Sequence, residues 1–132
     1  MSKKIIVGNL KMNPLTLKEA EKLFSGVAKE VSRVKKTEVV ICSPFIYLER
    51  LKKIRTSKIK LGAQDAFGGD VGAFTGDISP FMLSSIGVRY VILGHSERRA
   101  LGENNNDINK KIKASISAVL VPILCVGESV RD

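Results

Sequence analysis

The stretch that decides the fold of this chain is residues 90–99, Tyr-Val-Ile-Leu-Gly-His-Ser-Glu-Arg-Arg. Its apolar run, residues 90–93, has the length of a buried strand, and Gly94 ends it. The polar residues that follow predict a helical turn over residues 96–99. Chemically reactive side chains directly after an apolar strand are typical of parallel α/β proteins, where such groups gather at strand ends.

The same apolar pattern recurs on both sides of this stretch. Buried strands are predicted at residues 4–9, 38–42, 59–63 and 121–126 as well as at 90–93. Successive strands recur after roughly 20 to 33 residues, which is the size of a βα unit. Nearly continuous apolar strands that alternate with helical patterns predict a parallel sheet with right-handed crossovers.

Helical patterns fill most of the connections. Thr16 and Glu19 have capping-box spacing ahead of an apolar stripe. Ser43-Pro44 and Ser79-Pro80 predict helix starts capped by serine, with proline in the first turn. A further helix is predicted from an apolar stripe in the last third of the chain. The two stripes consist of Leu17, Ala20, Phe24, Val27, Val31 and Val34, and of Ile108, Ile112, Ile116 and Val119.

One long connection has no periodic pattern. Residues 64–79 include four glycines and show neither helical nor strand spacing. Loops of this length in compact domains are usually functional or interfacial, so we expect one of those roles here.

Composition indicates one soluble domain. The chain has 132 residues, of which 44% are hydrophobic and 5% aromatic, so its core must be largely aliphatic. Cys42 and Cys125 lie in apolar runs, which predicts buried free thiols and fits a reducing cytoplasm. The start lacks a signal-peptide pattern, and no apolar stretch approaches the roughly 18 residues that cross a membrane. We therefore expect a cytoplasmic protein.

The charge is strongly basic. Lys and Arg number 22 against 13 Asp and Glu, a formal net charge of +9 that attracts anions such as phosphates. Much of the excess lies in the lysine pairs at 3–4, 35–36, 52–53 and 110–111. Because no aromatic residues alternate with them, we interpret these pairs as solvated surface charge. A basic nucleic-acid-binding module is the competing interpretation, and salt-dependent retention on nucleic acid would be needed to support it.

Three side chains near predicted strand ends are candidates for chemistry. Lys11 can present an ammonium group to a phosphate or a carbonyl oxygen, although a lysine there can equally be surface charge. His95, the only histidine, precedes a helix start, which disfavours imidazolium and favours a neutral, hydrogen-bonding ring. A structural histidine is the alternative. Glu97 can be an acid or base, but the cations nearby favour an ion pair.

Taken together, the motifs closely resemble the signatures of the triosephosphate isomerase family, in its order and spacing. They are residues 9–13 (Asn-Leu-Lys-Met-Asn), 90–99 and 122–128 (Pro-Ile-Leu-Cys-Val-Gly-Glu). Gln64 with residues 72–76 (Gly-Ala-Phe-Thr-Gly) is similar to the family's third loop, which enters a neighbouring subunit. The resemblance runs over essentially the whole chain.

The resemblance implies a partial TIM (β/α)₈ barrel. Residues 1–132 would form a single incomplete domain of about four and a half βα units with a parallel sheet. The implied reaction belongs to glycolysis and gluconeogenesis and interconverts dihydroxyacetone phosphate and glyceraldehyde 3-phosphate through an enediolate. It requires neither a cofactor nor a metal.

Roles follow from the same resemblance. Lys11 would neutralise the substrate and the developing oxyanion, and Asn9 would help to orient the substrate. Neutral His95 would polarise the carbonyl and shuttle protons between the two oxygens. Ser96 and Glu97 would support the site, with Glu97 paired to Lys11.

Three more residues match supporting positions of the family. Thr75 would reach across a dimer interface and buttress the partner's site. Cys125 and Glu128 would be structural residues of the fifth strand and the following loop. Two departures from the family pattern stand out: Asp107 occupies a usually apolar helix position, and Val119 stands where a glycine commonly ends that helix.

The family fold has roughly 250 residues, whereas this sequence ends at Asp132. We therefore expect no counterpart of the glutamate base, the mobile lid or the later phosphate loops, and little or no activity without complementation. Asp65, Glu97 and Glu128 lie near strand ends and are the carboxylates that could replace the missing base. We expect each to have a structural role instead.

An open half-barrel would leave its first and fifth strands as edges. We expect a homo-oligomer or docking with a complementary C-terminal half. If two copies pair, the fifth strand would be displaced or the assembly would remain unclosed. The alternative is a non-catalytic, self-associating half-barrel that at most binds phosphate-bearing anions. Neither a membrane nor a nucleic acid is expected as a partner.

Overall fold

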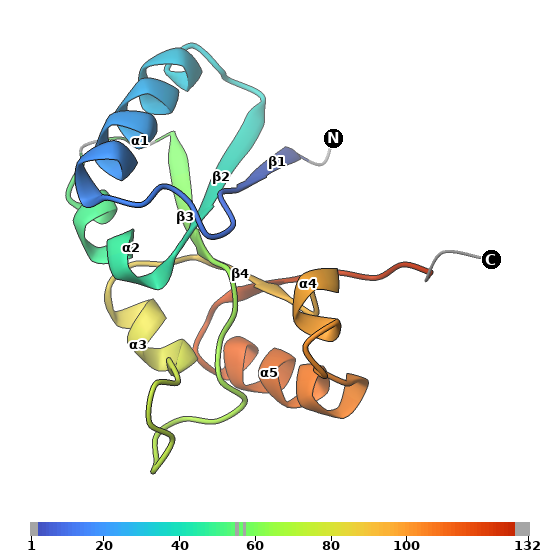
Figure 1. Ribbon diagram of the computed structural model, residues 1–132. Helices are drawn as coiled ribbons and strands as arrows, with labels where there is room; N and C mark the ends of the chain where they lie inside the picture. The colour runs from blue at the N-terminus through green and yellow to red at the C-terminus, as the bar shows by residue number, and fades with distance from the viewer. Residues whose placement is uncertain (1–2, 55, 57, 129–132) are drawn as a thin grey trace.

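Five parallel strands form one curled sheet in the computed structural model, which describes residues 3–54, 56 and 58–128 (Figure 1). The strands pair in chain order, from β1 to β5. The five predicted strand positions are confirmed, with ends that differ by at most two residues. The strands are β1 (Lys4–Asn9), β2 (Thr37–Ser43), β3 (Ile59–Ala63), β4 (Tyr90–Leu93) and β5 (Val121–Leu124).

The helices follow the strands and cover the outer side of the sheet (Figure 1). Thr16 and Glu19 form the predicted capping box at the start of the first helix. Ser79 caps the third helix, and Pro80 is its first residue, also as predicted. The helices are α1 (Leu17–Val31), α2 (Phe45–Lys52), α3 (Pro80–Ser85), α4 (Ser96–Arg99) and α5 (Asn105–Ser117).

The prediction that Ser43 caps the second helix is wrong. Ser43 is the last residue of β2, in register with Ala63 of β3, and it is fully buried. Pro44 occupies the cap position of α2 and makes no side-chain capping bond. Because Ser43 remains in the strand ladder, its hydroxyl donates to the Pro44 carbonyl oxygen instead of capping the first turn.

The apolar stripe predicted for α5 holds only over its first half. Ile108 is buried, but Ile116 is 59% exposed and Val119 is 70% exposed, because the sheet ends at β5 and covers only part of this helix. Asn104 and Asp107 form a capping box, which accounts for an aspartate at a usually apolar position. Val119 has a φ of +63°, the left-handed conformation that glycine adopts easily.

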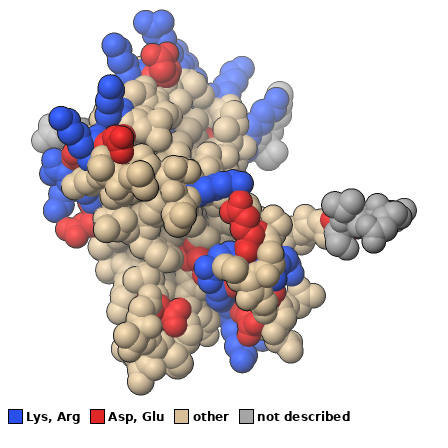
Figure 2. All heavy atoms as spheres, in the orientation of Figure 1, with Lys and Arg blue, Asp and Glu red and all other residues tan. Residues whose placement is uncertain are grey.

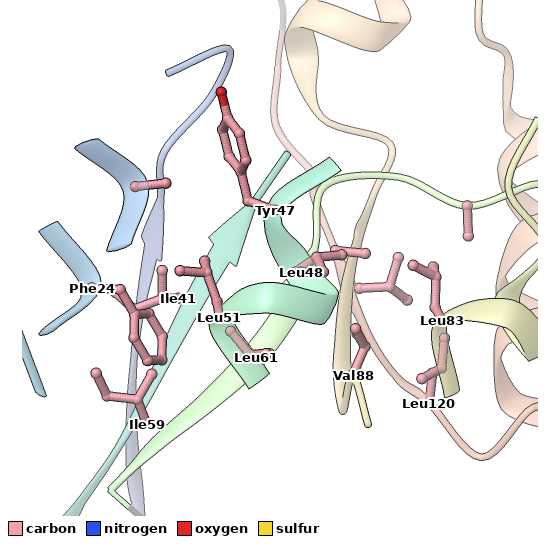
Figure 3. Packing of buried hydrophobic residues seen from close by; sticks show 14 of the residues in the cluster. Phe24, Ile41, Tyr47, Leu48, Leu51, Ile59, Leu61, Leu83, Val88 and Leu120 are labelled. Atoms are coloured by element: carbon pink, nitrogen blue, oxygen red, sulfur yellow. The ribbon is translucent and has the colours of Figure 1, made fainter. Parts of the chain in front are cut away.

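Alternate residues of the strands face two different cores, as strand geometry requires. Figure 3 shows the larger core, in which Phe24 of α1 and Leu48 and Leu51 of α2 pack against β2 and β3. The smaller core lies on the inner face of the curl. It contains Val40, Cys42, Tyr90 and Ile92, with Val121, Ile123 and Cys125 packed against them.

The first strand is not buried, contrary to prediction. Ile5, Ile6 and Val7 are 52%, 61% and 37% exposed. In the described part of the chain, β1 pairs only with β2, and neither face of β1 is fully covered. β5, the other edge, is half-buried over most of its length, and the predicted extension to residue 126 does not form. Both ends of the sheet therefore present edges.

Both thiols are free, as predicted, but the predicted burial is confirmed for Cys42 and wrong for Cys125. Cys42 is fully buried, and this burial, with a smaller effect of Cys125, raises the pKa of its thiol to about 12. Cys125 is only half-buried, because β5 has no neighbouring strand on its far side among the described residues. Within the described residues, no helix combines the length and the apolar character needed to span a membrane.

Candidate active site

Polar side chains from the carboxyl ends of β1, β3 and β4 meet around one pocket of about 180 Å³. Lys11 follows β1, Gln64 follows β3, and His95 and Glu97 follow β4. The parallel topology brings these groups together because every strand ends at the same rim. The pocket lining comprises Asn9, Lys11, Met12, Phe45, Gln64, Asp65, His95, Glu97 and Arg98.

Lys11 is held in a strained conformation that aims its ammonium at Glu97. Its φ is +55°, which is uncommon for a residue with a Cβ and recurs at functional sites. Its backbone N–H donates to Asn9 Oδ1 at 2.9 Å, and its Nζ donates to Glu97 Oε1 at 2.7 Å. The expected Lys11–Glu97 pair is therefore present.

Gln64 ties three strand ends together, a contribution that was not among the predicted site residues. Its Nε2 donates to Asn9 Oδ1 at 3.2 Å, to the Lys11 carbonyl oxygen at 2.8 Å and to the Cys42 carbonyl oxygen at 3.1 Å. Two N–H groups serve three acceptors, so one hydrogen is shared. The sequence signal for this role was the position of Gln64, an amide side chain directly after the apolar run of residues 59–63.

His95 caps α4, and this contact gives its two ring nitrogens different hydrogen-bonding roles. Its Nδ1 accepts a hydrogen bond from the Glu97 backbone N–H at 3.1 Å, which leaves the ring proton on Nε2. Glu97 Oε2 lies 3.6 Å from the same Nδ1, too far for a hydrogen bond. The donor at Nε2 is thereby left available on the side of the ring away from the Glu97 N–H.

Glu97 is an ionised partner of Lys11. The hydrogen bond from Lys11, its largest influence, holds the pKa of the Glu97 carboxyl below its usual value. A carboxylate of this kind binds a cation at neutral pH and is a poor proton acceptor. The structure thus favours the ion-pair interpretation of Glu97 over the acid–base one.

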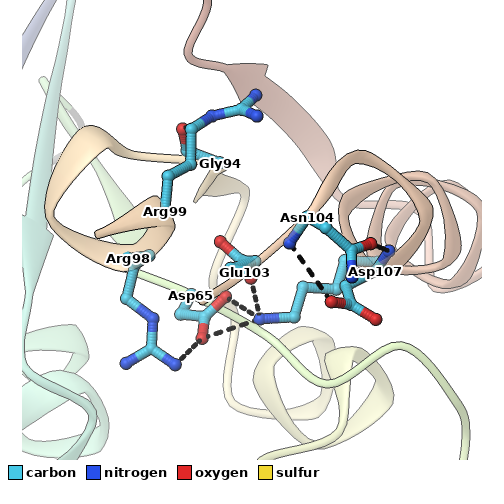
Figure 4. Close-up of polar contacts among 8 residues, drawn as sticks. Asp65, Gly94, Arg98, Arg99, Glu103, Asn104 and Asp107 are labelled. Carbon is cyan, nitrogen blue, oxygen red and sulfur yellow. Dashed lines mark hydrogen bonds and ion pairs between the residues drawn. The ribbon is translucent and has the colours of Figure 1, made fainter. Parts of the chain in front are cut away.

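Asp65 and Arg98 of the pocket lining belong to an ion-pair network with Glu103 and Lys111, which the sequence did not predict (Figure 4). Lys111 Nζ contacts Asp65 Oδ1 at 2.8 Å and also Glu103, and Arg98 contacts Asp65 Oδ2 at 3.2 Å. Burial alone would lower the pKa of Lys111, but hydrogen bonds to the two carboxylates outweigh burial and raise it. Asp65 is therefore held in ion pairs.

Arg99 joins the site to β5. Its Nε donates to the Gly94 carbonyl oxygen at 2.7 Å, and another guanidinium nitrogen donates to the Cys125 carbonyl oxygen at 3.1 Å. A second hollow of about 410 Å³ adjoins His95 here, and its lining includes Ser96, Cys125 and Glu128. These three predicted residues thus lie on the β5 side of His95.

Thr75 lies apart from these groups. It is exposed in the loop between β3 and α3, which projects from the body of the molecule (Figure 1), and it lines neither hollow. Across residues 3–54, 56 and 58–128, no cluster of three or more His, Cys, Asp or Glu side chains is arranged to hold a metal ion.

The sheet is parallel and curled, helices cover its outer side, and an ammonium, an amide and an imidazole group lie at its carboxyl rim. This arrangement is typical of (β/α)-barrel proteins. A crystal structure of triosephosphate isomerase from Bartonella henselae matches 97% of the chain with a TM-score of 0.83 and 37% identity. The match covers 53% of that structure. The predicted partial barrel is thereby confirmed.

A sequence model of triosephosphate isomerase matches residues 4–132, so the chain belongs to the triosephosphate isomerase family. A curated relative from Dehalococcoides mccartyi is 51% identical over 97% of this chain and 51% of its own length. Another, from Thermoanaerobacter pseudethanolicus, is 48% identical over all of this chain and 53% of its own length. The chain thus spans about half the length of the curated relatives it matches.

Proposed function

We propose that this chain supplies the lysine and histidine of a triosephosphate isomerase site. The reaction interconverts dihydroxyacetone phosphate and glyceraldehyde 3-phosphate within glycolysis and gluconeogenesis, without a cofactor or metal. The observation that carries the proposal is the convergence of Lys11, His95, Gln64 and Glu97 on one pocket at the carboxyl rim of the sheet. Family membership supports the same assignment.

Each group has a defined task in this proposal. The Lys11 ammonium, fixed by Glu97, attracts the anionic substrate and stabilises the oxyanion of the enediolate. Asn9 lies beside Lys11 and helps to orient the substrate. The Nε2–H of His95 donates to the substrate carbonyl oxygen, and the ring then moves a proton between the two enediolate oxygens.

The other predicted residues act indirectly. Ser96, Glu97, Cys125 and Glu128 support the rim around His95, and Thr75 reaches the corresponding site of a partner copy. We propose that the 132 residues act as one incomplete barrel domain in the cytoplasm. Its two sheet edges are covered by a complementary C-terminal half or by another copy.

The chain by itself is proposed to be inactive or very weak. Asp65 and Glu97 are both engaged by cations, which supports neither as a substitute for the catalytic base. A positioned base contributes about 10²- to 10⁴-fold to a rate, so the deficit should be easily measured.

The test is an isomerase assay on the chain alone and after addition of a separately produced C-terminal half of a relative. Complementation should raise the rate at least about 10²-fold. His95→Gln should abolish the gain, whereas the exposed Lys113→Gln should retain it. A complemented, folded assembly with no activity would contradict the proposal.

The second candidate is a non-catalytic, self-associating half-barrel that at most binds phosphate-bearing anions. The exposed apolar residues of β1 favour it. Sedimentation would then detect a stable oligomer, and complementation would produce no isomerase activity.

A further inference from the structure

The net positive charge is confined to the first half of the chain. Residues 1–60 contain 15 Lys and Arg against 5 Asp and Glu, whereas residues 61–132 contain 7 against 8. Figure 2 shows Lys and Arg gathered over the upper part of the molecule, where α1 and the amino ends of the first strands lie in Figure 1. The candidate active site lies at the opposite ends of these strands.

Part of this charge lines two hollows that share Ile54 and Thr56 in their linings. The hollows have volumes of about 520 Å³ and 640 Å³. We define the basic groove by the five cations in these linings: Lys29, Lys52, Lys58, Lys60 and Arg89. All five are exposed. Cations scattered over 60 residues of sequence are thus collected along one surface.

Among the described lining residues of the basic groove, Glu38 is the one carboxylate, and the hydrogen bond from Tyr90 and, more weakly, the charge of nearby Lys60 contribute to lowering its pKa. None of the five cations makes an ion pair with a carboxylate among the residues that the structure describes. Glu38, an acidic residue of the lining, is already engaged by Lys3 and Tyr90. Like charges gathered without ion pairs repel one another and oppose the compact state. An external polyanion would remove that cost.

Helix geometry explains only part of the basic groove. Lys29 and Lys52 lie in the last turns of α1 and α2, where a cation interacts favourably with the helix dipole. Lys60 lies on β3, and Lys58 and Arg89 each immediately precede a strand, where no such preference acts. These three positions distinguish the basic groove from ordinary helix termini.

The lining also restricts the kind of polyanion. Its two aromatic side chains, Phe24 and Tyr90, are buried, and the Tyr90 hydroxyl donates to Glu38. Proteins that bind single-stranded nucleic acid without sequence preference usually offer aromatic rings on which bases stack. The basic groove presents ammonium and guanidinium groups without such rings, so it suits a chain of phosphate groups that carries no bases.

We infer that the basic groove binds inorganic polyphosphate, a linear chain of phosphate groups. Binding occurs at the end of the sheet opposite the candidate active site and does not depend on isomerase activity. Ammonium and guanidinium groups contact successive phosphates and release condensed counterions, so affinity falls steeply as salt increases.

The test measures the anisotropy of end-labelled polyphosphate titrated with the 132-residue chain at 0.1 M salt. The triple variant Lys29→Gln, Lys58→Gln, Lys60→Gln should bind about tenfold more weakly or worse, with a shallower salt dependence. The matched variant Lys18→Gln, Lys22→Gln, Lys113→Gln loses the same charge outside the basic groove and should change affinity less than about threefold. Circular dichroism verifies that both variants fold.

Equal weakening by the two triple variants would overturn the inference, because net charge alone would then explain binding. Absence of binding at 0.1 M salt would also overturn it. So would tighter binding of an oligothymidylate or polyglutamate of equal charge. If the groove triple fails to fold, the variant with arginine at the same three positions must retain affinity, and its loss would contradict the inference.

Discussion

Lys111 is the cation whose removal should damage the fold most. Its Nζ lies 2.8 Å from Asp65 Oδ1 and also contacts Glu103 Oε1, and the Lys111, Asp65 and Glu103 side chains are only 14%, 17% and 7% exposed. In Lys111→Met, Arg98 would still compensate Asp65. Glu103 would lose its ion pair with Lys111, and its other oxygen, Oε2, is buried without a hydrogen-bond partner among the described residues.

Removal of one partner from a buried ion pair costs about 3–5 kcal/mol. We expect about 3 kcal/mol for Lys111→Met, the low end of that range, because Arg98 remains beside Asp65. Urea denaturation followed by circular dichroism, at two protein concentrations, measures the free energy of unfolding. Lys110→Met, an exposed neighbour, should change it by less than about 0.5 kcal/mol.

A second variant separates charge from packing. Glu103→Gln combined with Lys111→Met removes the buried carboxylate that the single variant leaves without a cation. It should recover part of the lost free energy of unfolding. A loss below about 1 kcal/mol in Lys111→Met, or no recovery in the double variant, would refute this reasoning.

Three further predictions concern other parts of the chain. The hydrogen bond between the Tyr90 hydroxyl and the Glu38 carboxylate raises the pKa of Tyr90 and lowers the pKa of Glu38. The stabilisation of the fold by this bond is therefore lost as pH rises through the folded pKa of Tyr90, and also as pH falls through the folded pKa of Glu38. Ultraviolet titration should detect Tyr90 ionising above the usual 10, and in Tyr90→Phe the Glu38 pKa, followed by NMR, should move toward 4.5. Val119→Gly should stabilise the chain to urea by about 1 kcal/mol, since glycine relieves the left-handed strain at an exposed position; destabilisation would contradict that strain. At pH 8 a disulfide reagent should modify Cys125 faster than Cys42, whose burial raises its pKa to about 12, and equal rates in the folded chain would contradict this order.

Local patterns were sufficient to predict the strands and two caps, because a strand or cap depends on residues close in sequence. Thr16 and Glu19 are three positions apart and form their predicted capping box. Burial is different, since it depends on which elements cover a residue. Ile5 and Ile6 have the character of core residues, yet they are exposed on an edge strand.

Candidate residues that stand in a motif could be named from the sequence, whereas contacts between residues distant in sequence could not. Lys11 and His95 stand in recognisable stretches, and they line the same pocket. The Asp65–Lys111 ion pair joins residues 46 positions apart, and the three acceptors of Gln64 come from two other strand ends. Such pairings require the register of the sheet, which periodicity alone does not provide.

The exposed first strand has a consequence for motion. Among the residues that the structure describes, β1 pairs with β2 alone, so we expect its amide hydrogens to exchange with solvent through openings that leave β2, β3 and β4 intact. Lys11 lies two residues after the end of β1 and would move with this strand. However, Gln64, which follows β3, donates a hydrogen bond from its Nε2 to the Lys11 carbonyl oxygen. The Gln64 side-chain amide should therefore limit how far local opening of β1 displaces the Lys11 ammonium.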